Sequence, residues 1–539
     1  SAGRKITQER NGEKIHYSYD DLDRVAQTQV GDLMTITKYD LLDREIEERK
    51  EDLNGRLLLK ETYGYDIAGN INCTTRFVMN QEEKEFKTYD SFGRLISNID
   101  PLGYETVTKY DETHVNSLKQ RVLKKTTIDP LGLQTIEIYT SQGRLASMEI
   151  KNSRNETRSL EEKYYDPNGN CARQVSTIFP TRKTITTLWE YGVMNRLKTL
   201  IEAYGTPESK TTRYTYTKKG LLFQTIKPDG VVLEKTYDRL GNPITLTSSD
   251  QTISYTYQYD NLGRLIQSQD VAKGTTTLRT LDSKGRILEE TLANGLILKN
   301  SYDKVGRRYE LSLPDNSSIV YEQDALYLRE VIRKDSNGFT LYTHLYKEYD
   351  LSGHLLNAAL FGGLGDITYA IDPLGRTSTI HTPYFAQEIL DHDPLGNITQ
   401  LKTQETTTSF TYDDLYQLVE ENGRFTHQYA YDSHQNRLQK DQESYYHNAL
   451  HELAHLQYDR NGNPTVYEGS HLSYDALDRL TSIETPTSRT LFTYDTFHRR
   501  LSKTAYLLEN GVWQEAEHLF FLYDGLNEIG AADRSGRLI

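Results

Sequence analysis

The sequence has few of the residues that hold small exported domains together or that separate domains. Two cysteines, Cys73 and Cys171, lie far apart among the 539 residues and supply no disulfide framework. Proline occurs 13 times, and no segment rich in proline or in glycine and serine divides the chain. No apolar run approaches the roughly 18 residues of a membrane-spanning helix. These absences argue against a disulfide scaffold, a string of linked domains and a helical membrane protein.

The chain is also poor in apolar residues and in positive charge. Only 36% of the residues are hydrophobic, and this count includes 40 tyrosines against 14 phenylalanines and 2 tryptophans. Such a supply is thin for several solid cores, although a chain of this length would ordinarily form more than one domain. The composition therefore favours a large one-layer sheet with two semi-polar faces. The net charge of -14 argues against a general nucleic-acid-binding protein, because phosphate binding needs clustered Lys and Arg.

What the chain does contain is a repeated unit, seen most clearly in Y-Q-Y-D-N-L-G-R-L at residues 257–265. Variants read Y-S-Y-D-D-L-D-R-V at 17–25, Y-D-S-F-G-R-L at 89–95, Y-D-R-L-G-N at 237–242 and Y-D-A-L-D-R-L at 474–480. The tyrosine before each aspartate recurs about every 20 to 26 residues, a period typical of repeat architectures. The whole chain is therefore expected to be a repeat protein.

Each position of the unit has a structural interpretation. Tyr257 and Tyr259 are two residues apart, so an extended strand places both rings on one face. Asp260 can accept a hydrogen bond from the backbone two residues later, and Gly263 can adopt the positive φ of a tight reversal. Where glycine is missing, its place is taken mostly by Asp or Asn, as at Asp23, Asp43, Asp478 and Asn195, and both tolerate positive φ. The unit therefore predicts a strand, a turn and a returning strand.

A second class of turn alternates with the first. Pro-Asp-Gly at 228–230, Ala-Asn-Gly at 293–295 and Pro-Asp-Asn at 314–316 fit hairpin connections at the other end of the strands. We therefore predict an all-β fold in which one antiparallel strip forms a single domain over residues 1–539. Two stretches, 113–125 and 445–456, place apolar residues at helical spacing and are the alternatives to continuous strand structure.

The motif that most resembles a catalytic site is H-E-x-x-H, formed by His451, Glu452 and His455. On a helix this spacing can hold zinc, with the glutamate as general base. However, residues 447–453 align without a gap with the repeat at 474–480, which places His451 at the Gly/Asp turn position. We therefore interpret this segment as a degenerate copy of the repeat, with a zinc enzyme as the weaker alternative. Asp-Pro-Leu-Gly occurs four times, at 100–103, 129–132, 372–375 and 393–396, and is predicted to form turns.

The repeated Y-x-Y-D-x-L-G-R-L resembles the tyrosine-aspartate (YD) repeats of the Rhs family, which are related to repeats in the C component of Tc toxins and in teneurins. The resemblance covers nearly the whole chain. It implies a β-strip that spirals into a hollow shell, which in bacterial members encloses a C-terminal toxin released by aspartyl self-cleavage. The family's self-cleaving segment and its catalytic aspartates have no matching positions here, so no catalytic residue is assigned.

This resemblance leads to a set of expectations about function. The chain is expected to be a non-catalytic shell of a secreted or cell-surface bacterial toxin, and a fragment of a longer protein. Its expected partners are a toxin cargo with its self-cleaving segment, together with possible secretion components, and neither cofactor, nucleic acid nor membrane span is expected. A teneurin-like module that binds a receptor or glycan is the alternative. The residues assigned a structural role in the repeat are Tyr19, Asp20, Tyr65, Asp66, Gly69, Tyr89, Asp90, Gly93, Arg94, Tyr237, Asp238, Gly241, Tyr259, Asp260, Gly263, Arg264, Tyr302, Asp303, Gly306, Arg307, Tyr474 and Asp475.

Overall fold

The computed structural model describes residues 5–10 and 13–539, which are almost entirely strands and turns. The first strands are β1 (Thr7–Arg10), β2 (Glu13–Tyr19), β3 (Val25–Val30), β4 (Leu33–Tyr39), β5 (Glu45–Asp52), β6 (Leu57–Tyr65), β7 (Ile71–Val78), β8 (Gln81–Tyr89), β9 (Leu95–Ile99), β10 (Glu105–Asp111), β11 (Lys124–Ile128), β12 (Gln134–Tyr139), β13 (Leu145–Lys151), β14 (Thr157–Tyr165), β15 (Cys171–Ile178) and β16 (Lys183–Tyr191). After the short 3-10 helix η1 (Val193–Asn195) follow β17 (Leu197–Glu202), β18 (Lys210–Tyr216), β19 (Leu222–Ile226), β20 (Val232–Tyr237), β21 (Pro243–Ser248), β22 (Ser254–Tyr259), β23 (Leu265–Asp270), β24 (Thr275–Leu281), β25 (Ile287–Thr291), β26 (Ile297–Tyr302) and β27 (Arg308–Ser312).

The second half of the chain continues in the same way. Its elements are β28 (Ser318–Gln323), β29 (Leu328–Lys334), β30 (Thr340–Tyr349), β31 (Leu355–Ala359), the 3-10 helix η2 (Phe361–Gly363), β32 (Asp366–Ile371), β33 (Thr377–His381), β34 (Ala386–His392), β35 (Ile398–Thr403), β36 (Thr406–Tyr412), β37 (Leu418–Asn422), β38 (Thr426–Tyr431), β39 (Arg437–Lys440), β40 (Glu443–Ser444), β41 (Gln457–Tyr458), β42 (Pro464–Tyr467), β43 (Ser470–Tyr474), β44 (Leu480–Glu484), β45 (Ser488–Tyr494), β46 (Arg500–Glu509), β47 (Val512–Asp524) and β48 (Asn527–Ala532).

The strands form a strip in which each one pairs antiparallel with its neighbours in the chain, except between β40 and β41. A 40-stranded sheet contains β1 to β40, and an 8-stranded sheet contains β41 to β48. The tyrosine of a YD unit ends its strand, and the pairing register shifts just before it, as between Gln258 and Tyr259. Because such a bulge strengthens twist locally, its recurrence at one edge of the strip bends the sheet. The sequence pattern did not predict these bulges.

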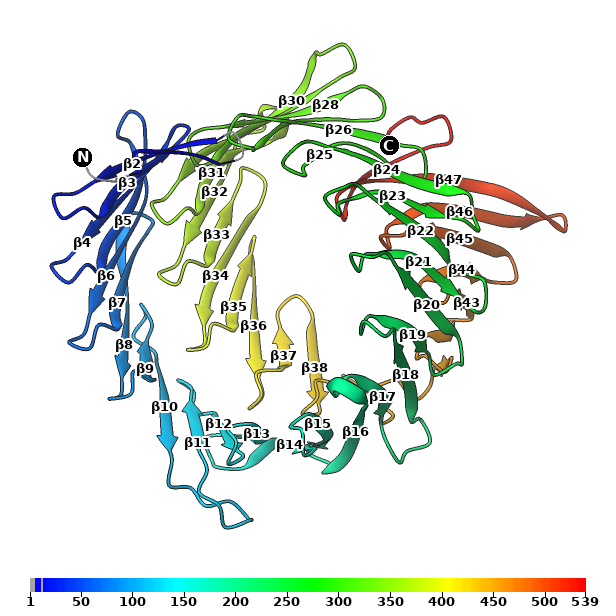
Figure 1. Ribbon diagram of the computed structural model, residues 1–539, viewed down its shortest axis with the longest axis horizontal. Helices are drawn as coiled ribbons and strands as arrows, with labels where there is room; N and C mark the ends of the chain where they lie inside the picture. Colours follow the sequence, from blue (N-terminus) through cyan, green and yellow to red (C-terminus); the bar gives the residue numbers. More distant parts are fainter. Residues whose placement is uncertain (1–4, 11–12) are drawn as a thin grey trace.

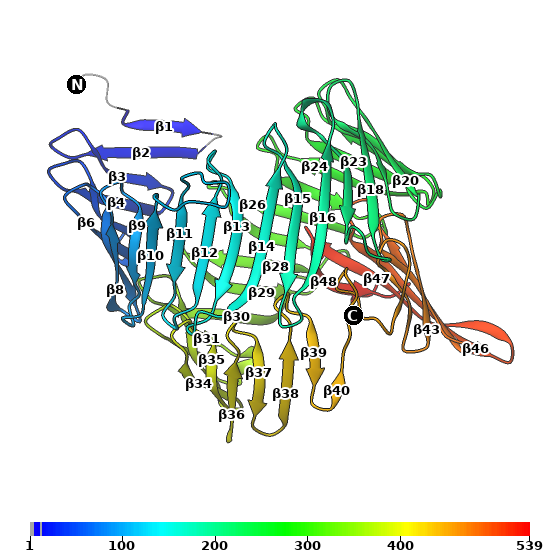
Figure 2. The same ribbon diagram turned by 90° about the horizontal axis from the view of Figure 1, so that it is seen from below.

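The strip winds through nearly two circuits (Figure 1). We call β2–β27 the first circuit and β28–β48 the second circuit. After one circuit, the turn that contains Val305 lies against the hairpin tip at Gly31, near the start of the strip. The approach is so close that a Cβ added to Gly31 would lie only 2.8 Å from Cγ1 of Val305. Figure 2 shows the strands standing side by side, with β36–β40 below β13–β16. In Figure 1 the strands of the described chain run around the rim of a ring, and none crosses its middle.

The wall is thin, as the composition predicted. The accessible surface is 30651 Å² for 62.2 kDa, whereas a compact protein of that mass exposes roughly 20,000 Å². The buried apolar clusters lie where the two circuits meet: Leu292, Leu298 and Leu311 pack with Phe521 and Leu522. The prediction of an all-β strip that spirals is therefore confirmed, and its cores lie between circuits.

The two stretches with helical spacing are not helices. Residues 113–123 form a small loop that is closed by an antiparallel bridge between Val115 and Arg121, and residues 124 and 125 already belong to β11. Residues 445–456 lie between the two sheets and contain a similar bridge between His447 and Leu453. In both places, asparagine at the turn hydrogen-bonds the backbone two and four residues later, which favours a tight turn over a helix.

Candidate functional site

The YD turn is held by its aspartate. Oδ1 of Asp260 accepts hydrogen bonds from the backbone N–H groups of Leu262 and Arg264, each at 2.9 Å, and Oδ2 accepts one from Nε of Arg264 at 2.6 Å. Gly263 has a φ of 76°. The N–H groups and the Arg264 guanidinium hold the pKa of Asp260 below its ordinary value. Each YD turn is therefore closed by one carboxylate.

Tyrosine and arginine connect successive units. The hydroxyl of Tyr39 donates to the carbonyl of Val25 at 3.0 Å, and Arg24, just before Val25, lies 4.9 Å from the centre of the Tyr39 ring. Nη1 of Arg24 also donates to the carbonyl of Asp40 at 2.7 Å. The same tyrosine hydrogen bond recurs from Tyr259 to Pro243. The motif therefore joins each hairpin to the next one along the strip.

The structure places every residue assigned a role in the repeat at a strand end or in a YD turn. The tyrosines that end strands are Tyr19, Tyr65, Tyr89, Tyr237, Tyr259, Tyr302 and Tyr474. Positive φ occurs at Gly69, Gly93, Gly241, Gly263 and Gly306. The carboxylates that accept backbone hydrogen bonds in these turns are those of Asp20, Asp66, Asp90, Asp238, Asp260, Asp303 and Asp475. Among the arginines, Arg94, Arg264 and Arg307 each pair with the aspartate four residues earlier.

The four Asp-Pro-Leu-Gly copies are turns, as predicted. In each of them the glycine N–H donates to the carbonyl of the aspartate, for example from Gly132 to Asp129 at 2.9 Å. The side chain of Asp129 also accepts a hydrogen bond from the hydroxyl of Tyr416 in the second circuit.

A feature that the sequence did not reveal is the seam between the two circuits. The strip has two edges, the YD edge with the YD turns and the tip edge with the other turns. Along the seam, the tip edge of the first circuit meets the YD edge of the second. Ion pairs that cross it include Arg158–Asp414, Lys210–Glu452 and Lys227–Asp478, and Arg308, at the YD end of β27 in the first circuit, pairs with Asp524 of the second; all four lie at 2.6 to 2.7 Å. The seam therefore joins parts of the chain separated by more than 200 residues.

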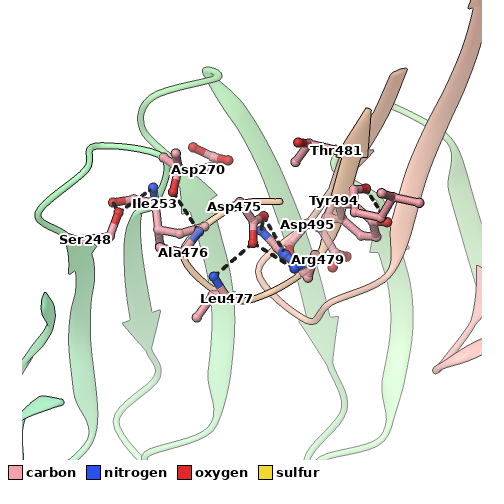
Figure 3. Close-up of polar contacts among 12 residues, drawn as sticks. Ser248, Ile253, Asp270, Asp475, Ala476, Leu477, Arg479, Thr481, Tyr494 and Asp495 are labelled. Atoms are coloured by element: carbon pink, nitrogen blue, oxygen red, sulfur yellow. Dashed lines mark hydrogen bonds and ion pairs between the residues drawn. The ribbon is translucent and has the colours of Figure 1, made fainter. Parts of the chain in front are cut away.

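One buried part of the seam lies around Asp475 and Arg479 (Figure 3). Arg479 pairs with Asp475 at 2.6 Å within its own turn, and its Nη2 donates to the hydroxyl of Tyr255 in the first circuit at 2.6 Å. Tyr255 is fully buried, and this burial raises its pKa to about 12. Arg479 therefore closes the turn of its own hairpin through Asp475 and also hydrogen-bonds to the other circuit through Tyr255.

The next YD turn extends this network. Arg499 is 3% exposed and pairs with Asp495 at 2.6 Å and with Glu290 of the first circuit at 3.2 Å. Glu290 is also paired with Arg279 at 2.9 Å, and the Arg279 guanidinium lies 4.2 Å from the centre of the Phe497 ring. Two cations and two anions thus balance each other inside the seam, as buried charges require.

The H-E-x-x-H segment does not form a helical metal motif. His451 has a φ of 64°, as its alignment with the turn position predicted. Its backbone N–H bonds to the carbonyl of Asn448, and Glu452 is held by Lys210 across the seam. His455 is exposed between the two sheets. Within residues 5–10 and 13–539, no group of three or more His, Cys, Asp or Glu side chains could hold a metal ion.

Comparisons with known proteins agree with this architecture. The RHS Repeat family model matches residues 237–276 and 474–506, two segments that meet at the seam around Tyr255 and Arg479. No curated protein sequence matches the chain. None of the helices in the described part of the chain has the length and apolar character to cross a membrane.

Solved structures show the same fold. The crystal structure of TcdB2-TccC3-Cdc42 is 15% identical, with a TM-score of 0.66 over 97% of this chain and 33% of that chain. The crystal structure of TcdB2-TccC3 is 14% identical, with a TM-score of 0.65 over 96% of this chain and 33% of the other. TcdB2-TccC3 without its hypervariable C-terminal region gives 14% identity and a TM-score of 0.66, over 97% of this chain and 32% of the other. The chain spans about a third of the length of these solved chains.

Proposed function

We propose that this RHS-repeat protein is the non-catalytic wall of a hollow shell that encloses a polypeptide cargo. The observation that carries the proposal is a one-layer strip that closes on itself along a charged seam, with half as much accessible surface again as a compact protein of its mass. A wall built in this way surrounds a volume, whereas a solid domain fills it.

The seam suits a container that must stay shut. Strands inside the strip are paired on both sides, which leaves few open sheet edges with which other chains could pair. Stacking one circuit on the other also covers turns of both circuits. Within a circuit the hairpins are joined by Tyr–carbonyl hydrogen bonds, and between circuits by ion pairs such as Lys210–Glu452. Such a wall separates inside from outside without a disulfide, since Cys73 and Cys171 are both free.

The lining suits a cargo of no fixed sequence. Strand residues alternate between the two faces, and Thr and Tyr are frequent on both, as in β18 and β22. A surface of this kind offers hydrogen bonds and partial apolar contact to any chain, and strands such as β5 and β8 carry acidic and basic residues together, so no single sign of charge selects one sequence. We propose that the cargo is a toxic polypeptide, that residues 1–539 form one domain of a longer secreted bacterial protein, and that neither catalysis nor a cofactor takes part.

Electron microscopy of the purified protein tests this proposal. We expect a wall one sheet thick around a low-density centre, and a polypeptide produced with the protein should resist trypsin while the shell is intact. A particle with protein density throughout its centre would refute the container. So would a polypeptide that trypsin cleaves equally fast with and without the shell.

A further inference from the structure

The second circuit is attached to the first in two different ways. Its β29–β40 part, which we call the flap, and the 8-stranded sheet β41–β48 both place YD turns on hairpin tips of the first circuit. The ladder of paired strands is interrupted between them, since β40 and β41 do not pair in the described structure. One side of the flap therefore continues the ladder from β28, whereas its other side ends without a neighbouring strand.

The flap is held to the first circuit mainly by polar contacts. Asp350, in the turn after β30, accepts a hydrogen bond from the backbone N–H of Met79 at 2.8 Å. Asp414, in the turn after β36, pairs with Arg158 at 2.6 Å, but these two side chains are 38% and 32% exposed. Contacts of this kind replace hydrogen bonds to water, so each one adds little net stability to the docked flap.

The 8-stranded sheet is attached mainly by buried groups. Phe521 in this sheet and Ala476 in one of its turns belong to two of the buried apolar clusters, and Ala449, in the link before the sheet, belongs to the third. Within the described residues, no member of these clusters lies in the flap. The side chains of Arg499 and Glu290, which pair across the seam, are 1% and 5% exposed. Because the burial of apolar surface adds stability in proportion to its area, the sheet is docked more firmly than the flap.

We propose that the flap opens away from the first circuit as one unit while β41–β48 stays docked. The flap turns about its ladder with β28 and parts from the hairpin tips along the seam. Because β40 has no partner in β41, this movement separates no paired strands. Such an opening joins the inside of the ring to the outside through the wall. The inference rests on the contacts within the seam and does not depend on a cargo.

Thiol labelling at two matched positions tests the proposal in the whole chain, with both native cysteines replaced by serine. Val78→Cys places one thiol at a hairpin tip beneath the flap, where Val78 lines a cavity together with His354. Ile253→Cys places the other at a hairpin tip that packs against Ala476 of the 8-stranded sheet. The native side chains are 4% and 1% exposed, so each thiol reacts only after the seam above it opens. We expect Ellman's reagent to label Val78→Cys at least about tenfold faster than Ile253→Cys.

A substitution in a distant turn of the flap tests whether the flap moves as one unit. Asp414→Asn removes the charge that pairs with Arg158, whereas Val78 lies under a different turn of the flap. This substitution should speed the labelling of Val78→Cys about threefold or more and leave that of Ile253→Cys unchanged. The matched control, Asp260→Asn, changes a first-circuit turn away from the seam and should alter neither rate.

Two results would overturn the proposal. One is an equal labelling rate for the two thiols. The other is an Asp414→Asn variant that leaves the labelling of Val78→Cys unchanged, because the turns of the flap would then open one by one. Circular dichroism verifies that each variant is folded. Should a cysteine variant fail to fold, hydrogen exchange of the wild type makes the same comparison. The N–H of Met79, which bonds to the flap, should exchange faster than that of Ala476, which bonds to Thr252.

Discussion

Replacing Arg499 by methionine removes a cation from the most buried part of the seam. Arg499, Asp495 and Glu290 are 3%, 1% and 4% exposed. Without the guanidinium, Asp495 keeps only backbone donors, and Glu290 keeps only Arg279. Breaking a buried ion pair by removing one partner costs about 3–5 kcal/mol, because the remaining charge is left without compensation. We therefore expect Arg499→Met to weaken the docking of the second circuit by this amount.

The same motif in the first circuit supplies the control. Arg264 pairs with Asp260 in the same way, but the two side chains are 30% and 21% exposed and no other circuit covers their turn in the described residues. An exposed pair is worth about 0–1 kcal/mol, so Arg264→Met should have a small effect. The comparison separates the seam from the turn, since both variants lose the same hydrogen bond within the hairpin.

Hydrogen exchange measured peptide by peptide is the appropriate assay, because a strip of this length opens locally and not in one step. At about 1.4 kcal/mol per tenfold change, Arg499→Met should speed exchange in β25 and in the turn after β45 about 150-fold or more. Arg264→Met should change exchange around β22 and β23 less than about tenfold. Equal effects of the two substitutions would refute the view that burial in the seam gives the motif arginine its importance.

Two further predictions concern the turns. Since the pKa of Asp260 and of the equivalent first-circuit aspartates is lowered on folding, their contribution to stability is present above the unfolded pKa of about 3.9 and lost as pH falls through the lower folded value. The thermal midpoint, followed by circular dichroism, should stay level between pH 7 and pH 5 and fall below pH 4, and a loss that begins near pH 6 would contradict this. Gly230 has a φ of 91° and open space where a Cβ would stand, so Gly230→Ala should cost about 1–2 kcal/mol through backbone strain alone. Gly230→Asn should cost less, and equal thermal midpoints for both variants and the wild type would show that the turn does not need positive φ.

The sequence predicted the local structure well because the interactions that close the turn join residues close together in the chain. Asp260 and Gly263 act within five residues, and their chemistry is the same wherever the unit occurs. Even His451 could be assigned to a positive-φ turn, because its segment aligns with intact copies of the repeat. The bulge at Gln258 and Tyr259 was not predicted, because the amino-acid sequence does not distinguish a regular strand end from a bulged one.

The seam could not be predicted because the circuit length is not fixed by the repeat. The separation in sequence between residues that meet across the seam falls from 275 for Phe77 and Ser352 to 216 for Arg308 and Asp524. Strands and loops of different length change the number of residues per circuit, and small differences add up over some twenty strands. A contact such as that between Lys210 and Glu452 therefore cannot be predicted from a fixed repeat period.

The seam does explain the leucine of the repeat, which is the one position that has no role within a single hairpin. Aspartate and glycine close the turn, and arginine and tyrosine join it to the next unit, as in Arg24 and Tyr39. The leucine two residues after the aspartate does neither, and a solvated turn would gain nothing from it. Its side chain becomes useful only when another circuit lies above it, as for Leu477. The same leucine recurs in the first circuit at Leu42 and Leu240, where it is 71% and 79% exposed, so burial by the other circuit and not the turn itself decides whether this side chain contributes to packing.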